Sequence, residues 1–264
     1  MNNFKSPLAR RLAKLTACVT FIALVSFIPP ANKKIKVYLV GDSTMCFYDK
    51  TRFPQEGWGM PFANYFDSSV QVDNRARGGR SSRSFIEEKL WKPIADSLQE
   101  GDYVLIQFGH NDPSNSADHP NRKATPEEFG KYLTQYITET RAKKANPILI
   151  TPMTQRKFDK DGKVMETHAP YSRVMMDVAA ANNVPLIDLD GKSRELVQKF
   201  GPEFSKYLYL DLDPGQSPNY PRGYHDITHF CEFGARKMAE IVLAGIIDQK
   251  LELADHVVKP AVKK

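Results

Sequence analysis

Short apolar runs alternate along the chain with segments in which apolar residues recur every three to four positions. The apolar runs cover residues 35–40, 70–74, 103–108, 147–151 and 184–188. The segments with helical spacing cover residues 84–98, 125–144, 169–181 and 233–243. A regular alternation of strands and helices is typical of βαβ units. The pattern therefore predicts an α/β domain built on a parallel five-stranded sheet.

The segment 125–144 has the clearest helix signals. Thr125 precedes Pro126, a residue favoured at the first helical position, and Glu128 completes a capping box with Thr125. Its apolar positions follow the spacing i, i+3, i+4, i+7, i+8 and are Phe129, Tyr132, Leu133, Tyr136 and Ile137. We expect this face to pack on the sheet.

The first 31 residues differ in composition from the rest of the chain. Four cations and no acid precede a fourteen-residue apolar run from Leu15 to Ile28, the pattern of a secretory signal. The run is shorter than the roughly 20 residues that span a membrane. We expect a signal peptide or N-terminal anchor in 1–31, one exported domain in 32–250 and a basic tail in 251–264. Membrane association is expected only if the N-terminal segment stays uncleaved.

Charge and cysteine content narrow the function classes. Removing residues 1–31 takes away four cations, so the formal net charge falls from +6 to +2. No basic stripe with interleaved aromatics is present, which argues against a nucleic-acid partner. Cys46 and Cys231 then remain, and the sequence leaves open whether they pair. The chain has no CxxC or HExxH spacing, so we expect no metal.

Four polar blocks follow or flank the predicted strands. They are "GDST" with Ser43, "NRARGGRSSRSF" with Gly79, "QFGHND" with Asn111, and "DITHF" with Asp226 and His229. In an open parallel sheet, the loops after the carboxyl ends of the strands share one edge, where ligands bind. The first three blocks are therefore expected to converge.

The residue types in these blocks match the needs of acyl transfer. A serine becomes a nucleophile when an imidazole takes its proton, and a carboxylate orients that imidazole. Asp226 and His229 are three apart, so in a helical turn they share one side. Glycine and asparagine can supply oxyanion donors. Each block also has a plainer interpretation, as a cap, a turn or an exposed pair. These plainer interpretations do not explain why a serine, a glycine, an asparagine and an Asp-x-x-His pair all occur at the same expected edge of the sheet. Their joint occurrence favours a hydrolase.

Together the blocks resemble those of the SGNH hydrolases, also called GDSL-type esterases, and are closest to the rhamnogalacturonan acetylesterase-like branch. The resemblance runs from about residue 35 to 247. It implies a flavodoxin-like three-layer α/β/α fold with strand order 2-1-3-4-5. Carried over by block, the resemblance implies that Ser43 is the nucleophile and an oxyanion donor, and that Gly79 and Asn111 complete the oxyanion hole. It implies that His229 is the base and that Asp226 orients the imidazole of His229. The α/β-hydrolase motif G-x-S-x-G is absent.

The resemblance also suggests residues around the cleft. Trp58 in "QEGWGMPF" is expected to border it, and Asp42 to brace the nucleophile loop. Arg80, His168 and Arg222 stand near the blocks, and together with Trp58 they are expected to bind substrate. Arg83, Tyr171 and Tyr224 lie in the same segments.

The resulting expectation is an exported carbohydrate esterase that deacetylates a plant cell-wall polysaccharide, with pectic rhamnogalacturonan as the leading substrate. It needs no cofactor, and its partner is an acetylated polysaccharide or oligosaccharide. Two alternatives stay open: a lipid esterase or thioesterase of the same fold, and a non-catalytic sugar-binding protein. The sequence does not indicate an oligomeric state.

Overall fold

The computed structural model describes residues 34–115, 117 and 119–259. All elements below lie within residues 35–264, one of the two units into which the chain divides. The N-terminal segment expected to be a signal or anchor lies outside the described residues. Among the residues described, no helix has the length and apolar character needed to cross a membrane.

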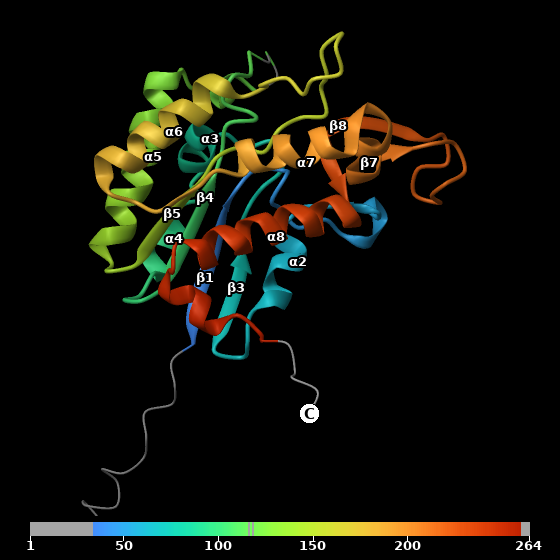
Figure 1. Cartoon of the computed structure of the whole chain (residues 1–264). Coiled ribbons are helices and arrows are strands. Elements are labelled where there is room, and N and C mark those ends of the chain that lie inside the picture. Colours follow the sequence, from blue (N-terminus) through green and yellow to red (C-terminus); the bar gives the residue numbers. More distant parts are fainter. Residues whose placement is uncertain (1–33, 116, 118, 260–264) are drawn as a thin grey trace, which may run out of the picture. The chain divides into compact units, whose positions relative to one another are not determined.

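The central sheet has five parallel strands in the order β3-β1-β4-β5-β6. This arrangement, with helices on both faces (Figure 1), confirms the predicted fold class. The strands are β1 (Ile35–Gly41), β3 (Val70–Asn74), β4 (Tyr103–Gln107), β5 (Asn146–Ile150) and β6 (Leu186–Ile187).

Side chains that alternate along β1 enter two separate apolar cores. Val37 and Leu39 join a cluster that includes residues of α2 (Gly59–Phe62), α7 (Leu189–Phe204) and α8 (Glu232–Asp248). Tyr38 and Val40 join the second cluster. That cluster includes residues of α3 (Ser82–Glu87), α4 (Lys92–Ser97), α5 (Pro126–Ala142) and α6 (Ala169–Asn182). A sheet buried on both faces explains why its strands read as continuous apolar runs.

The predicted helices are present, with two differences. Thr125 and Glu128 form the expected capping box at the start of α5. The single helix predicted over 84–98 is two helices, α3 and α4, because Lys89 adopts a φ of 60° between them, a left-handed conformation that a right-handed helix cannot contain. Helix α7 was not predicted. The 3₁₀ helices are η1 (Lys50–Arg52), η2 (Ala63–Tyr65), η3 (Pro120–Arg122), η4 (Ser205–Leu208) and η5 (Glu252–His256).

A second, antiparallel sheet occupies a region that the sequence indicated to be irregular. Its order is β2-β8-β7, formed by β2 (Gln55–Glu56), β8 (Tyr224–Cys231) and β7 (Tyr209–Leu212). Phe230 lies opposite Tyr209 and His225 opposite Asp211, so four residues of β8 face one of β7. The segment 226–229 is therefore a bulge within a strand. The expected helical turn is corrected, because the residues on either side of this segment are held in a strand: Tyr224 and His225 pair with β7, and Phe230 and Cys231 pair with β2.

The domain extends further toward the C-terminus than expected. Leu253 in η5 is fully buried, and Val257 forms an antiparallel bridge with Phe66. Residues 251–257, the first part of the segment predicted to be a basic tail, therefore pack against the domain.

Candidate active site

Ser43 stands in a tight turn that follows β1, and no helix begins there. Asp42 closes the turn, because its carbonyl accepts the N–H of Cys46. Its carboxylate accepts the N–H and the hydroxyl of Thr44, so it braces the loop as expected. Between Gly41 and Cys46, only Ser43 keeps partly exposed surface. Since no helix follows, the N-cap interpretation of Ser43 is excluded.

A continuous chain of hydrogen bonds links Ser43 to a carboxylate on the second sheet. Nε2 of His229 lies 2.9 Å from Oγ of Ser43, and Nδ1 of His229 lies 2.8 Å from Oδ2 of Asp226. The other oxygen of Asp226 accepts the backbone N–H groups of Thr228 and His229, at 2.6 and 3.0 Å. Asp226 thus acts both as a local cap and as the partner of the ring. This geometry can activate a serine hydroxyl.

The loop after β5 holds the bulge in place. The N–H of Arg156 donates to the carbonyl of Ile227, and Nε2 of Gln155 donates to Oγ1 of Thr228. Partial burial works against ionisation of Asp226, but the hydrogen bonds and charge of His229 outweigh it and lower the pKa of Asp226. The carboxylate therefore stays charged beside the ring.

Gly78 and Gly79 lie beside Ser43. A Cβ placed on Gly78 would stand 3.8 Å from Cβ of Ser43, and Gly79 has a φ of +77°, which favours glycine. Among the described residues, the N–H groups of Ser43 and Gly79 find no acceptor. Nδ2 of Asn111 donates one hydrogen to the carbonyl of Arg80 at 3.0 Å, which leaves its second N–H. These N–H groups are available to an oxyanion.

Asp112 joins the two loops that carry Gly79 and Asn111. Its Oδ1 accepts the N–H and the hydroxyl of Ser82 at 3.0 and 2.5 Å, and its Oδ2 accepts the N–H of Gly109 at 3.0 Å. Complete burial raises the pKa of Asp112 to about 7 despite these donors. No helix begins at Asn111 or Asp112, because η3 and α5 have His119 and Thr125 as their N-caps; Asp112 links the two loops and Asn111 stays at the site.

Trp58 has a different place from the one expected. Its side chain has no exposed surface, and its Nε1 donates to Oε1 of Gln107 at 2.5 Å. Nε2 of Gln107 in turn donates to Oγ1 of Thr44. Full burial keeps Trp58 from contacting a polysaccharide, so its assignment as a substrate contact is corrected to a support of the nucleophile turn. The neighbouring Gly57 allows close approach, because a Cβ there would lie 2.2 Å from the carbonyl oxygen of Cys46.

Two histidines lie ring to ring behind the same turn. The ring centroids of His110 and His168 are 4.3 Å apart, and Nδ1 of His168 lies 2.9 Å from Oγ1 of Thr167. Burial and the neighbouring His110 lower the pKa of His168 to about 3. His168 is 4% exposed, so substrate could reach only its edge. Sequence reasoning missed His110, although it stands within the block "GHND".

The arginines proposed from the sequence differ in their surroundings. Arg80 donates to Glu88 and to the carbonyl of Gly78, and Arg83 is paired with Glu87. Arg222 is exposed and lines a hollow of about 430 Å³. Arg80 and Arg83 are therefore each paired with a glutamate, whereas Arg222 has no ion pair within the described part of the chain.

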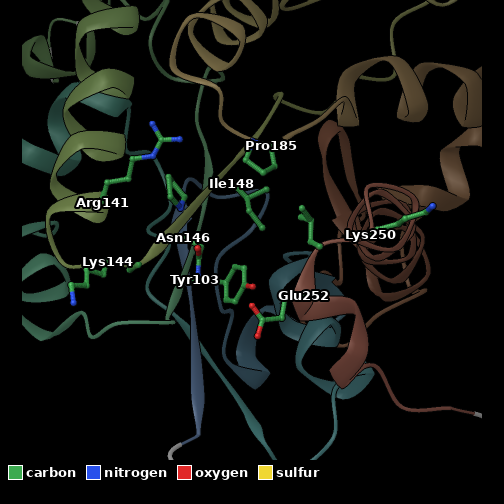
Figure 2. Close-up of a pocket in the computed structure, with 11 residues that line it drawn as sticks. Tyr103, Arg141, Lys144, Asn146, Ile148, Pro185, Lys250 and Glu252 are labelled. Atoms are coloured by element: carbon green, nitrogen blue, oxygen red, sulfur yellow. The ribbon is translucent and has the colours of Figure 1, made fainter.

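Two further hollows lie at opposite edges of the central sheet. One of about 530 Å³ adjoins the nucleophile turn and is lined by Cys46, Phe47, Tyr48, Asp73, Asn74, Arg75, Ala76, Arg77 and Gly78. Another, of about 510 Å³, includes Tyr103 and Asn146, the first residues of β4 and β5, so it lies at the opposite edge of the sheet (Figure 2). The first hollow therefore adjoins the turn that carries Ser43, and the second does not.

The thiols Cys46 and Cys231 do not pair. Both are free, with Cys46 buried, and Sγ of Cys231 donates to the carbonyl of Tyr207. Within the described ranges, no three His, Cys, Asp or Glu side chains converge as metal ligands would.

Known proteins carry a similar sequence and fold. The family model described as GDSL-like Lipase/Acylhydrolase matches residues 39–234. Rhamnogalacturonan acetylesterase RhgT from Bacillus subtilis is 40% identical over 86% of this chain and 96% of its own. The probable rhamnogalacturonan acetylesterase YesY of the same organism is 37% identical over 84% and 97%. The crystal structure of Bacillus subtilis YxiM superposes with a TM-score of 0.70 at 27% identity, covering 83% of this chain and 58% of that one. The chain belongs to the GDSL-like lipase/acylhydrolase family of ester-hydrolysing enzymes.

Proposed function

We propose that this protein is an exported serine esterase that removes acetyl groups from plant cell-wall polysaccharide, with acetylated rhamnogalacturonan as its substrate. The observation that carries the proposal is the chain from Asp226 through His229 to Ser43, beside N–H groups that have no acceptor in the described residues. The names of the relatives RhgT and YesY supply the substrate. The composition of residues 1–31 supports export.

In the first half of the reaction, Oγ of Ser43 attacks the acetyl carbonyl carbon while Nε2 of His229 takes the hydroxyl proton. The carbonyl oxygen becomes an oxyanion, which accepts hydrogen bonds from the N–H groups of Ser43 and Gly79 and from Nδ2 of Asn111. The carbon–oxygen bond to the sugar then breaks, and His229 returns the proton to the departing sugar oxygen. The product is a free sugar hydroxyl and an acetyl group on Ser43.

In the second half, His229 takes a proton from a water molecule while the oxygen of that water attacks the carbonyl carbon of the acetyl group on Ser43. The same donors stabilise the second oxyanion. Collapse releases acetate and restores the hydroxyl of Ser43. Asp226 holds the ring in the required tautomer and stabilises the imidazolium in both halves, a role favoured by its lowered pKa.

The surroundings of the nucleophile suit a sugar polymer. Phe47 and Tyr224 expose 67% and 43% of their surface, and line the hollows of about 530 and 430 Å³, respectively. Exposed rings beside charged groups can stack on sugar faces, and Arg77 and Arg222 in these hollows would favour an anionic backbone. Pectic substrates are therefore expected to outperform neutral ones.

The test is acetate release from acetylated rhamnogalacturonan, acetylated homogalacturonan and acetylated xylan. We expect the highest kcat/KM on rhamnogalacturonan. Its advantage over xylan should shrink with added salt, because exposed charges are screened over roughly 8–10 Å. A fluorophosphonate should label Ser43. The Ser43→Ala variant should lose about 10⁴–10⁶ in kcat, as in serine proteases whose triad members are removed. Appreciable turnover by folded Ser43→Ala would refute the mechanism. Equal rates on pectin and xylan, insensitive to salt, would refute the substrate class.

A further inference from the structure

The guanidinium of Arg122 lies against the glycine of the candidate oxyanion hole. Arg122 ends η3, after the long loop that follows β4. A Cβ placed on Gly79 would stand 2.6 Å from Nη2 and 3.2 Å from Cζ of Arg122. The guanidinium thus occupies the space where a side chain at position 79 would be. Sequence reasoning did not single out Arg122, because nothing local relates it to Gly79.

Arg122 also differs from the other arginines in its surroundings. Among the described residues, five arginines have a side chain without a hydrogen bond or ion pair: Arg77, Arg122, Arg173, Arg222 and Arg236. The other four are exposed, and Arg122 alone is partly buried. A guanidinium that gives up water without gaining an acceptor is unfavourable. Its position is therefore best explained by an anionic group that arrives with the substrate.

The anion that Arg122 meets is not the oxyanion itself. The N–H groups of Ser43 and Gly79 and the amide of Asn111 already offer three donors, and an alkoxide oxygen has three lone pairs. The guanidinium has two edges of N–H groups, which match the two oxygens of a carboxylate. It therefore fits a second group on the substrate, close to the ester.

We propose that Arg122 binds the carboxylate of a uronic acid residue in the substrate, close to the acetylated position. This inference rests on the proposed function, and it names the residue that selects an acidic sugar. The carboxylate keeps its charge throughout the reaction, so the contact is as strong in the ground state as in the transition state. Its loss should raise KM and leave kcat nearly unchanged, whereas loss of an oxyanion donor lowers kcat.

The test compares two forms of one acetylated galacturonate-containing oligosaccharide, with free carboxylates and with methyl-esterified carboxyls, by acetate release. Arg122→Gln should lower kcat/KM about 10- to 100-fold on the free form, through KM, as expected for a charge-assisted hydrogen bond. On the esterified form the change should stay within about threefold, since its carbonyl still accepts weak hydrogen bonds but carries no charge. Arg122→Lys keeps the positive charge but loses the two parallel N–H groups of the guanidinium. Its kcat/KM on the free form should therefore lie between those of the unaltered enzyme and Arg122→Gln. Arg173→Gln removes an equal charge from an exposed, unpaired position on α6 and should change neither rate.

The outcomes separate this inference from the proposed function. Hydrolysis of a small neutral ester, p-nitrophenyl acetate, reports whether each variant keeps a working centre. Equal losses on both forms, or a loss confined to kcat, would make Arg122 an oxyanion or structural residue and overturn the inference. Unchanged rates on both forms would also overturn it, with the esterase function intact. Failure of the unaltered enzyme to release acetate from either form would instead refute the proposed function.

Discussion

Oδ2 of Asp42 and Nδ1 of His110 lie 3.1 Å apart behind the nucleophile turn, with both side chains buried. Nε2 of His110 lies 3.1 Å from the carbonyl oxygen of Met153. Burial by itself would raise the pKa of Asp42, but the charge and hydrogen bond of His110, together with the donors of Thr44, lower it. The ring nitrogens of His110 therefore lie between two hydrogen-bond acceptors, the carboxylate of Asp42 and the carbonyl of Met153. This buried hydrogen-bonded pair supports the turn that carries Ser43.

Breaking this pair should be costly. His110→Phe leaves the carboxylate of Asp42 buried without its partner, and we expect the free energy of unfolding to fall by about 3–5 kcal/mol. The double variant Asp42→Asn/His110→Phe removes the charge while keeping an oxygen for Thr44, so it should be more stable than the single variant. Urea unfolding of the unaltered protein, the single variants Asp42→Asn and His110→Phe, and the double variant measures this. A double variant destabilised by the sum of the two single changes would show that the residues do not act as a pair.

Asp226→Asn should abolish most activity while leaving the fold intact. An asparagine can still accept the N–H groups of Thr228 and His229 through its oxygen, but its amide would then face Nδ1 of His229 and favour the wrong tautomer. We expect kcat to fall by about 10⁴, the loss seen for the equivalent change in a serine protease. Steady-state acetate release measures it. Asp96→Asn, which alters an exposed surface pair with Lys92 on α4, serves as control, and near-normal turnover by Asp226→Asn would contradict the assigned role.

Removal of the Asn111 amide tests the oxyanion hole. Its hydrogen bond to the oxyanion forms fully only in the transition state, so Asn111→Ala should lower kcat by about 10²–10³ with little change in KM. Because Nδ2 also donates to the carbonyl of Arg80, thermal unfolding should be measured in parallel. Asn121→Ala, on the nearby η3, is the matched control. A change confined to KM would make Asn111 a substrate contact instead.

The buried carboxyl of Asp112 predicts a pH dependence of stability. Its pKa is about 7 in the folded protein against an ordinary value of 3.8, so between about pH 4 and 7 the folded state holds a proton that the unfolded chain releases. The free energy of unfolding should therefore fall as pH rises across this window. Asp112→Asn removes the titration and should flatten the fall, as measured by urea unfolding at pH 4.5 and 7.5. Parallel curves for the two proteins would refute the assignment.

The two thiols of the domain should be unreactive in the folded protein. Burial raises the pKa of Cys46 to about 11 and also raises the pKa of Cys231, so few thiolates exist near neutral pH. We expect slow reaction with a thiol reagent in the native state and rapid reaction of both after unfolding without reductant. Mass spectrometry of the labelled peptides identifies each site. A missing label on both cysteines in the unfolded, non-reduced chain would indicate a disulfide.

Local patterns in the sequence were sufficient to predict the five-stranded sheet and helices α5, α6 and α8, but not α7 or the break between α3 and α4. The strands around Val37, Leu105 and Ile148 are continuous apolar runs because the sheet is covered on both faces, and Thr125 with Glu128 marks a helix start by contacts within one turn. The placement of Ser43, Gly79 and Asn111 at one edge also follows, because parallel strands bring successive loops together.

Tertiary structure alone decided how the remaining residues meet. The bulge that turns His229 toward Ser43 depends on pairing with β7 and on the loop after β5, partners that lie far away in the sequence. Burial of Trp58 depends on its hydrogen bond to Gln107. Arg80 pairs with Glu88, whereas the guanidinium of Arg122 is left available to bind an anion; this difference depends on which carboxylates lie near each arginine. Periodicity reports whether a position faces the core, because that depends on neighbours within a turn or two. Which distant side chain satisfies a polar group depends on packing between elements, and that is the level at which this site is assembled.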